Sequence, residues 1–180
     1  MYNESQIQEF EGRSNMEIRR FSGTDNIDDV SRVYAQSWKS AYSGIVPQDY
    51  LDSIPEDRWS EILLGELSNL WVVSDGKRII GSSTYAPARD EKYGGWGEII
   101  SIYLLPEYFH QGIGTKLLRA SMDELVTMGY SDLYLWVLKD NCPARRFYEK
   151  NGFRFNGDIM QYVIGDKPLS EVRYVYQECK

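Results

Sequence analysis

The sequence predicts a single mixed α/β domain, in which a sheet of hairpin-joined strands continues into a strand–helix–strand–helix unit. The chain has 180 residues, a length that suits one domain. Its composition, 42% hydrophobic and 26% charged, is typical of a globular protein. Short apolar runs dominate much of the first half, whereas helical periodicity alternates with apolar runs in the second. We expect the domain to span residues 16–180, after a disordered arm at residues 1–15 that shows no apolar periodicity.

The first half predicts a strand, two helical regions and three further strands. These are a strand at 16–21, helical regions at about 24–42 and 48–67 (the second interrupted at Pro55), and strands at 71–73, 78–85 and 96–105. The Thr24-Asp25 pair is a suitable helix cap, and Gly44 and Pro47 separate the two helical regions. Residues 74–77, with a central Asp-Gly, predict a hairpin turn.

The second half predicts two helices that alternate with strands. Apolar residues recur on one helical face from Gly112 to Met128, and Gly129 supplies a left-handed cap. The continuous apolar run at 133–138 fits a strand that is covered on both faces. A short helix at about 141–150, with Pro143 in its first turn, precedes the last strands, which we expect at 153–155, 160–164 and 171–176.

Charge and cysteine content argue against several functional classes. The 20 basic and 27 acidic residues give a formal net charge of −7, which repels nucleic-acid phosphates. No apolar stretch is long enough to span a membrane, and the N-terminal residues show no secretory signal. Two cysteines without a C-x-x-C pattern and one histidine predict neither a metal site nor a disulfide framework. We therefore expect a cytoplasmic monomer or homodimer with no nucleic-acid, membrane or metal partner.

A glycine-containing turn joins the long apolar strand to the helix that follows it. The segment Gln111-Gly112-Ile113-Gly114-Thr115 opens this helix. Its glycines let backbone N–H groups approach an anion, and the helix N-terminus adds partial positive charge. The turn therefore suits a pyrophosphate, although a tight turn without a ligand has the same pattern. The third glycine of a dinucleotide fingerprint and the Gly-Lys-Ser/Thr of an ATP site are both missing, so those sites are disfavoured.

A second motif, Asn141-x-x-Ala144-x-x-x-Tyr148-x-x-x-Gly152-Phe153, covers the short helix. Together the two motifs resemble those of the GNAT superfamily of N-acetyltransferases, Q/R-x-x-G-x-G/A and N-x-x-A-x-x-x-Y-x-x-x-G-F. The resemblance covers about residues 16–177. It implies transfer of an acetyl group from acetyl-CoA to a primary amine, by direct attack in a ternary complex. It also implies the acyl-CoA N-acyltransferase fold, a mostly antiparallel sheet of about six or seven strands with a central parallel pair and about four flanking helices.

The same resemblance assigns the cofactor site. The implied contacts are the backbone of Ile102 and Leu104, the turn residues His110, Gln111, Gly112, Ile113, Gly114 and Thr115, and Asn141, Ala144 and Tyr148. Phe109 is a departure, because the family usually has Gln or Arg there. The backbone amides do most of the phosphate binding in the family, so the cofactor assignment stands. We expect His110 to face solvent or to touch phosphate rather than to act as a base.

Catalytic roles are implied on the long strand and the short helix. An amine with a pKa of about 10.4 is protonated at neutral pH and needs a base. Glu98 holds the position of that base, and its apolar neighbours predict a raised pKa; it is otherwise a substrate anchor or a structural partner of Lys or Arg. The backbone N–H of Ile102 would stabilise the oxyanion. Tyr148 is the candidate general acid for the leaving thiolate, or else a packing tyrosine.

The acceptor site is implied to lie between the first helices and the last strands. Trp38, Tyr42 and Tyr50, together with Glu98, are candidate substrate contacts, although such aromatic residues also build cores. Six acids and one Arg occupy the segment Asp49 to Glu66. They favour a small cationic amine, unless they only face solvent. A protein N-terminus, a lysine, or a non-catalytic acyl-CoA-sensing role are the alternatives.

Overall fold

A computed structural model describes residues 16–177, which form seven strands, five α-helices and three short 3-10 helices. The elements are β1 (Met16–Arg20), α2 (Ile27–Ala41), α3 (Gln48–Ser53), α4 (Ser60–Leu64), η1 (Leu67–Asn69), β2 (Leu70–Asp75), β3 (Arg78–Pro87), η2 (Glu91–Tyr93), β4 (Gly97–Leu104), η3 (Pro106–Tyr108), α5 (Ile113–Thr127), β5 (Asp132–Leu138), α6 (Cys142–Lys150), β6 (Arg154–Ile164) and β7 (Lys167–Gln177). The arm predicted at residues 1–15 lies outside the described residues. None of the described helices is long and apolar enough to cross a membrane.

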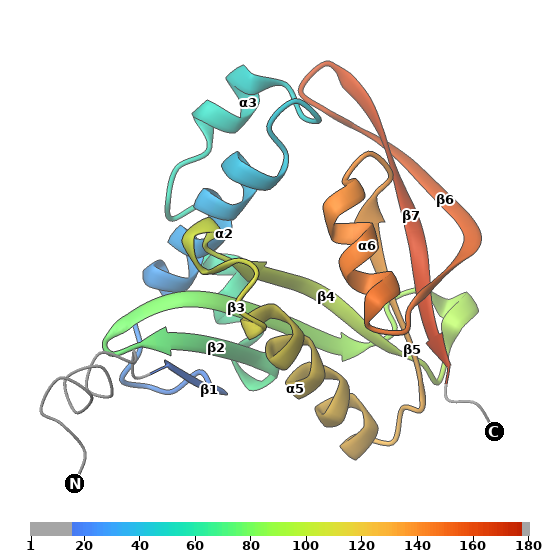
Figure 1. The fold of residues 1–180 in the computed structure, drawn as a ribbon, viewed down its shortest axis with the longest axis horizontal. Coiled ribbons are helices and arrows are strands. Elements are labelled where there is room, and N and C mark those ends of the chain that lie inside the picture. The colour runs from blue at the N-terminus through green and yellow to red at the C-terminus, as the bar shows by residue number, and fades with distance from the viewer. Residues whose placement is uncertain (1–15, 178–180) are drawn as a thin grey trace, which may run out of the picture.

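All seven strands belong to one sheet with the order β1-β2-β3-β4-β5-β7-β6 (Figure 1). Every neighbouring pair is antiparallel except β4 and β5, which run parallel. This parallel pair follows from the β4–α5–β5 connection, since a helical crossover returns the chain in the same direction. The predicted fold class, a mostly antiparallel sheet with a central parallel pair, is confirmed.

Helices cover both faces of the sheet. Ser83 of β3 accepts a hydrogen bond from Ser121 of α5 at 2.9 Å, whereas the next residue, Thr84, is linked through Ser101 to Tyr34 of α2. Successive side chains of a strand point to opposite faces, so α2 and α5 lie on opposite sides of the sheet. We call these the α2 face and the α5 face.

The predicted elements are present, but the number of helices and the extents of β6 and β7 differ from the prediction, since β7 begins at Lys167. The predicted interruption at Pro55 is confirmed, since residues 54–59 separate α3 from α4; the structure has five α-helices rather than about four. The two short strands predicted at 153–155 and 160–164 are one strand, β6. Its register against β7 shifts between Phe155 and Ile159, and Gly157 has φ +96°. The glycine therefore forms an irregularity inside a strand instead of ending it.

Candidate active site

The N-terminus of α5 is open toward solvent. Its N-cap, Gly112, has φ 78° and provides no side-chain cap, unlike Asn26 of α2 and Asn141 of α6, whose side chains accept backbone hydrogen bonds. A Cβ at Gly112 would meet no atom within 4 Å. The first N–H groups of α5 are therefore available to an anion, and no acidic residue occupies the first turn.

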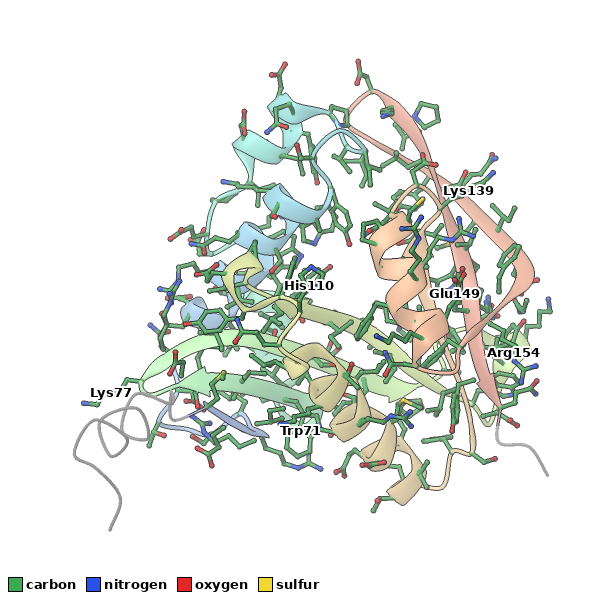
Figure 2. All side chains as sticks on the ribbon, viewed as in Figure 1. Trp71, Lys77, His110, Lys139, Glu149 and Arg154 are labelled. Atoms are coloured by element: carbon green, nitrogen blue, oxygen red, sulfur yellow. The ribbon has the colours of Figure 1, made fainter. Side chains whose placement is uncertain are left out.

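His110 belongs to the loop that leads into α5 (Figure 2). It is exposed, and among the described residues it is the one non-glycine with a positive φ, 61°. Gly114, on the first turn of α5, lies against Phe147 of α6, since a Cβ there would be 3.6 Å from the Phe147 ring. The glycine thereby allows the open end of α5 to pack beside the helix that carries Tyr148.

Strands β4 and β5 separate partway along their length. Their pairing ends at Ile99 and Leu135, although β4 continues to Leu104 and β5 to Leu138. The separation coincides with a bulge, because Ile99 and Ser101 pair with adjacent residues of β3 and Ile100 has no partner there.

The separation leaves backbone groups of β4 without a strand partner. The N–H of Leu105 donates to Ile80 of β3 at 2.9 Å. Bonded and non-bonded pairs alternate in an antiparallel ladder, so Ile102 and Leu104 direct their amides away from β3, toward the gap beside β5. The carbonyl of Leu104 accepts a hydrogen bond from Ser37 at 3.1 Å. The N–H groups of Ile102 and Leu104 thus face the gap, where an extended chain could add as a further strand.

Tyr148 extends from α6 into the core on the α5 face. Its side chain is 8% exposed, and its ring contacts those of Phe147 and Phe153 with centroid separations of 5.3 and 6.1 Å. Burial, with smaller contributions from Tyr103 and Glu171, raises the pKa of Tyr148. The phenol is therefore protonated and can donate a proton. Asn141 caps α6 by accepting from the N–H of Ala144 at 3.2 Å.

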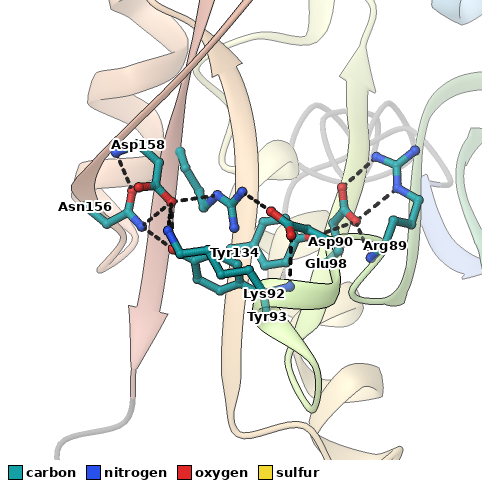
Figure 3. A network of polar contacts seen from close by, with 9 residues as sticks. Arg89, Asp90, Lys92, Tyr93, Glu98, Tyr134, Asn156 and Asp158 are labelled. Carbon is teal, nitrogen blue, oxygen red and sulfur yellow. Dashed lines mark hydrogen bonds and ion pairs between the residues drawn. The ribbon is translucent and has the colours of Figure 1, made fainter.

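Glu98 is held by an ion pair (Figure 3). Its side chain is 2% exposed, and its carboxylate accepts hydrogen bonds from Arg89 Nε at 3.0 Å, Arg89 N at 3.2 Å and Tyr134 Oη at 2.8 Å. Burial alone would raise the pKa of Glu98, but the Arg89 and Tyr134 hydrogen bonds outweigh it and the pKa is lowered. The expectation of a raised pKa is wrong, because apolar sequence neighbours do not reveal an arginine nine positions away. The geometry matches the alternative in which Glu98 is a structural partner of an arginine.

A second ion pair fixes the loop that carries Arg89. Arg173 of β7 is buried and pairs with Asp90. Its guanidinium also stacks on Tyr93, 3.8 Å from the ring centroid, and on Tyr134, 4.8 Å away. The β3–β4 loop is therefore tied to β7, so that Arg89 remains next to Glu98.

A pocket of about 250 Å³ lies on the α2 face beside the bulge. Its walls are Tyr34, Trp59, Ile62, Leu63, Glu66, Thr84, Arg89, Ile100, Ser101 and Tyr103. Three aromatic rings therefore share the site with one carboxylate, Glu66, and with the Arg89 that pairs with Glu98. Of the acids in the segment Asp49 to Glu66, only Glu66 lines this pocket, and the other five are exposed.

The aromatic residues predicted to contact the acceptor do not line this pocket. Trp38 donates its indole N–H to Tyr103 at 2.9 Å and meets the Tyr42 ring edge-on at 4.9 Å. Trp38, Tyr42 and Tyr50 pack around a core formed by α2, α3 and the ends of β5 and β7. Their contacts match the alternative, in which they are packing residues; Trp38 reaches the pocket only through the Tyr103 hydroxyl.

Glu171 is a half-buried carboxylate that the sequence analysis did not identify. It lies on β7, opposite Leu138 of β5 and Met160 of β6. Burial raises the pKa of Glu171, while a hydrogen bond from Tyr162 lowers it in part. Its charge in turn raises the pKa of Tyr42 and Tyr148. The sequence signal was a single acid at the start of the strand predicted at 171–176.

Comparison with known proteins gives consistent matches. Residues 31–153 match the model of the acetyltransferase (GNAT) family. The uncharacterized N-acetyltransferase YuaI of Bacillus subtilis is 35% identical over 130 residues, 69% of this chain and 73% of that protein. The spermidine N(1)-acetyltransferase of Thermoplasma acidophilum is 32% identical over 145 residues, 77% and 88% of the two chains. The crystal structure of the PaiA N-acetyltransferase from the same organism, in complex with coenzyme A, superposes with a TM-score of 0.73 at 26% identity and covers 91% of this chain and 99% of that one.

Proposed function

This chain belongs to the acetyltransferase (GNAT) family, and from that membership we propose that it transfers an acetyl group to a small cationic primary amine in a ternary complex. Membership confirms the predicted enzyme class, an acyl-CoA-dependent N-acetyltransferase, and acetyl-CoA as its donor. The observation that carries the proposal is the open N-terminus of α5, packed through Gly114 on the helix of Tyr148.

The donor fits residues on three elements. The amides at the start of α5, from Ile113 to Thr115, would bind the pyrophosphate, with Gln111 and His110 in the loop before them. The N–H groups of Ile102 and Leu104 would hold the pantetheine arm in the gap between β4 and β5. Acetyl-CoA supplies an acetyl group that is activated as a thioester. The N–H of Ile102 would stabilise the negative charge on the thioester oxygen, and Tyr148 would donate a proton to the sulfur.

The acceptor pocket suits a cation. Aromatic faces attract ammonium groups, and the rings of Tyr34, Trp59 and Tyr103 line the pocket together with the Glu66 carboxylate. The Thermoplasma relative that is 32% identical is named a spermidine N(1)-acetyltransferase, which supports the same class of acceptor. Arg89 also lines the pocket, but its charge is balanced by Glu98.

The test is a panel of acceptors assayed by release of free CoA thiol. Spermidine, a neutral primary amine, an acidic amino acid, and peptides with a free N-terminus or a lysine would be compared at low and high salt. We expect spermidine to have the highest kcat/KM and the largest loss at high salt, because salt screens its attraction to Glu66. A preference for an acidic amine or a peptide would reject the acceptor class. CoA binding without thiol release for any amine would indicate a sensor.

A further inference from the structure

We propose that Glu171 of β7, and not Glu98, is the base that takes the proton from the acceptor amine. The inference rests on the function proposed above and assigns a catalytic residue to that same site. The two carboxylates differ in their surroundings: the described charges that act on Glu171 are Arg89 and Glu98, whereas Glu98 makes a direct ion pair with Arg89. Both carboxylate oxygens of Glu98 accept hydrogen bonds, three on Oε2 and one from Arg89 on Oε1, so Glu98 is already committed to Arg89 and Tyr134.

Sheet register places Glu171 on the same face of the sheet as the acceptor pocket, outside the residues that line the pocket itself. Val172 and Tyr174 share a core with Tyr148 and Phe153, on the α5 face. Glu171 alternates with Val172, so it points to the α2 face. Its partner Leu138 packs there against Ala35 and Leu51 of the α2 and α3 helices.

The gap between β4 and β5 connects the two faces. Tyr148 comes to this region from the α5 face, where it packs with Val137 and Ile102, and Glu171 lies on the α2 face; its charge makes a small contribution to the raised pKa of Tyr148. The other titratable or charged groups near Glu171 are Tyr42 of α2, Tyr162 of β6, and Arg89 with Glu98. A thioester held in the gap would therefore have a proton acceptor on one side and a proton donor on the other.

The step conserves atoms and charge. The Glu171 carboxylate removes one proton from the ammonium group, and the free nitrogen electron pair then forms the C–N bond with the thioester carbon. The C–S bond breaks, and the sulfur receives the proton of Tyr148. The phenolate of Tyr148 recovers a proton that the new amide nitrogen releases, directly or through water. The products are the amide and CoA thiol, and Glu171 gives its proton to solvent.

The test compares pH profiles of kcat/KM for the best acceptor. The wild type should show a plateau that begins above the ordinary glutamate range, because burial raises the pKa of Glu171. Glu171→Gln should lower kcat/KM at pH 7 by about 10²-fold or more. Its kcat/KM should then rise about tenfold per pH unit toward the pKa of the amine, since only the free amine reacts. Asp166→Asn, which removes an exposed carboxylate from the β6–β7 turn, is the matched control and should keep the plateau.

Two readouts do not depend on loss of activity. In Tyr162→Phe the hydrogen bond that lowers the pKa of Glu171 is missing, so the start of the plateau should move to higher pH. In the free protein, carboxyl ¹³C NMR should show one glutamate titrating above the usual range, absent in Glu171→Gln and shifted upward in Tyr162→Phe. A CoA-induced thermal shift establishes that each variant is folded.

The outcomes separate this inference from the proposed function. A wild type without transfer to any amine rejects the proposed function, whatever the variants do. An active wild type whose Glu171→Gln variant keeps the plateau and its rate overturns the inference alone. Loss of the plateau in Glu98→Gln, with Glu171→Gln unaffected, would assign the base to Glu98.

Discussion

Replacing Gly112 by Glu tests whether the start of α5 binds the donor. The substitution puts a side chain on a residue with φ 78°, which costs about 1–2 kcal/mol of folding free energy. No further steric cost is expected, because a Cβ at this position meets nothing within 4 Å. The new carboxylate lies at the positive end of the helix dipole, which stabilises the folded state by about 0.3–1 kcal/mol. The variant should therefore fold with a small loss of stability.

The effect on CoA binding should be much larger. The carboxylate would occupy the space of the pyrophosphate and repel it, and loss of one charge-assisted hydrogen bond costs about 1.5–3 kcal/mol. This corresponds to a Kd raised by about 10- to 150-fold. At a CoA concentration of about 100 times the wild-type Kd, ligand stabilisation is about 2.7 kcal/mol. It should fall to about 1.4 kcal/mol or less in the variant, measured as the change in unfolding free energy with and without CoA.

Gly129→Glu is the matched control at the other end of the same helix. Gly129 also has a positive φ, 98°, and open space for a Cβ. Its carboxylate would lie at the negative end of α5, so this variant should be the less stable of the two, yet it should bind CoA like the wild type. Equal CoA affinity in Gly112→Glu and Gly129→Glu would refute the assignment of the pyrophosphate site to the start of α5.

Three further predictions concern the acid, the ion pair and the acceptor pocket. Tyr148→Phe should keep CoA binding and lose kcat by about 10²–10⁴-fold in the thiol assay; a wild-type kcat would place the proton donor elsewhere. Arg89→Met should cost about 1–3 kcal/mol at pH 7, less than the loss of a fully buried pair, because the Arg89 side chain is 62% exposed. Pairing lowers the pKa of Glu98, so this stabilisation is present above the pKa of about 4.3 in the unfolded chain and is lost as pH falls through the pKa in the folded protein. Thermal unfolding from pH 3 to 8 should therefore show the stabilities of the wild type and the variant converging in acid. A stability difference that does not change with pH would contradict the pairing. Glu66→Gln should raise KM for spermidine about three- to tenfold at low salt. Asp52→Asn, which removes an exposed charge, should leave this KM unchanged. Equal effects of the two substitutions would mean that the pocket does not select the cation.

The elements and the motifs could be predicted because their signals are local. Gly112 in a left-handed N-cap, Asn141 as a helix cap and Pro143 in the first turn each act within a few residues of themselves. The alternation of strands and helices in the second half likewise determines the parallel pair. The separation of β4 from β5 could not be predicted in this way, because it coincides with a bulge at Ile100 that depends on the pairing of β4 with β3.

The electrostatics of the site could not be predicted because they depend on contacts between distant segments. Glu98 has apolar neighbours in sequence, but the fold brings Arg89 and Tyr134 to it, which reverses the expected pKa shift. The acids from Asp49 to Glu66 appeared as one group, yet only Glu66 reaches the pocket. The other five acids are exposed on α3, on α4 and in the connection between them, and the sequence does not show which of the six faces the pocket.

The separated strands explain why acid and base can come from different layers of the protein. A continuous sheet keeps its two faces apart, because backbone hydrogen bonds close the space between neighbouring strands. Here β4 and β5 pair only up to Ile99 and Leu135, so a group from the α5 face and one from the α2 face can approach the same point. Tyr148 and Glu171 approach the gap from these two faces, and the charge of Glu171 makes a small contribution to the raised pKa of Tyr148. Glu98 lies where β4 and β5 are still paired, opposite Tyr134, which places its carboxylate behind the point of separation and in contact with Arg89. Glu98 therefore has a structural role in the paired part of the sheet, whereas Glu171 lies on β7 opposite Leu138, in the part of β5 that no longer pairs with β4.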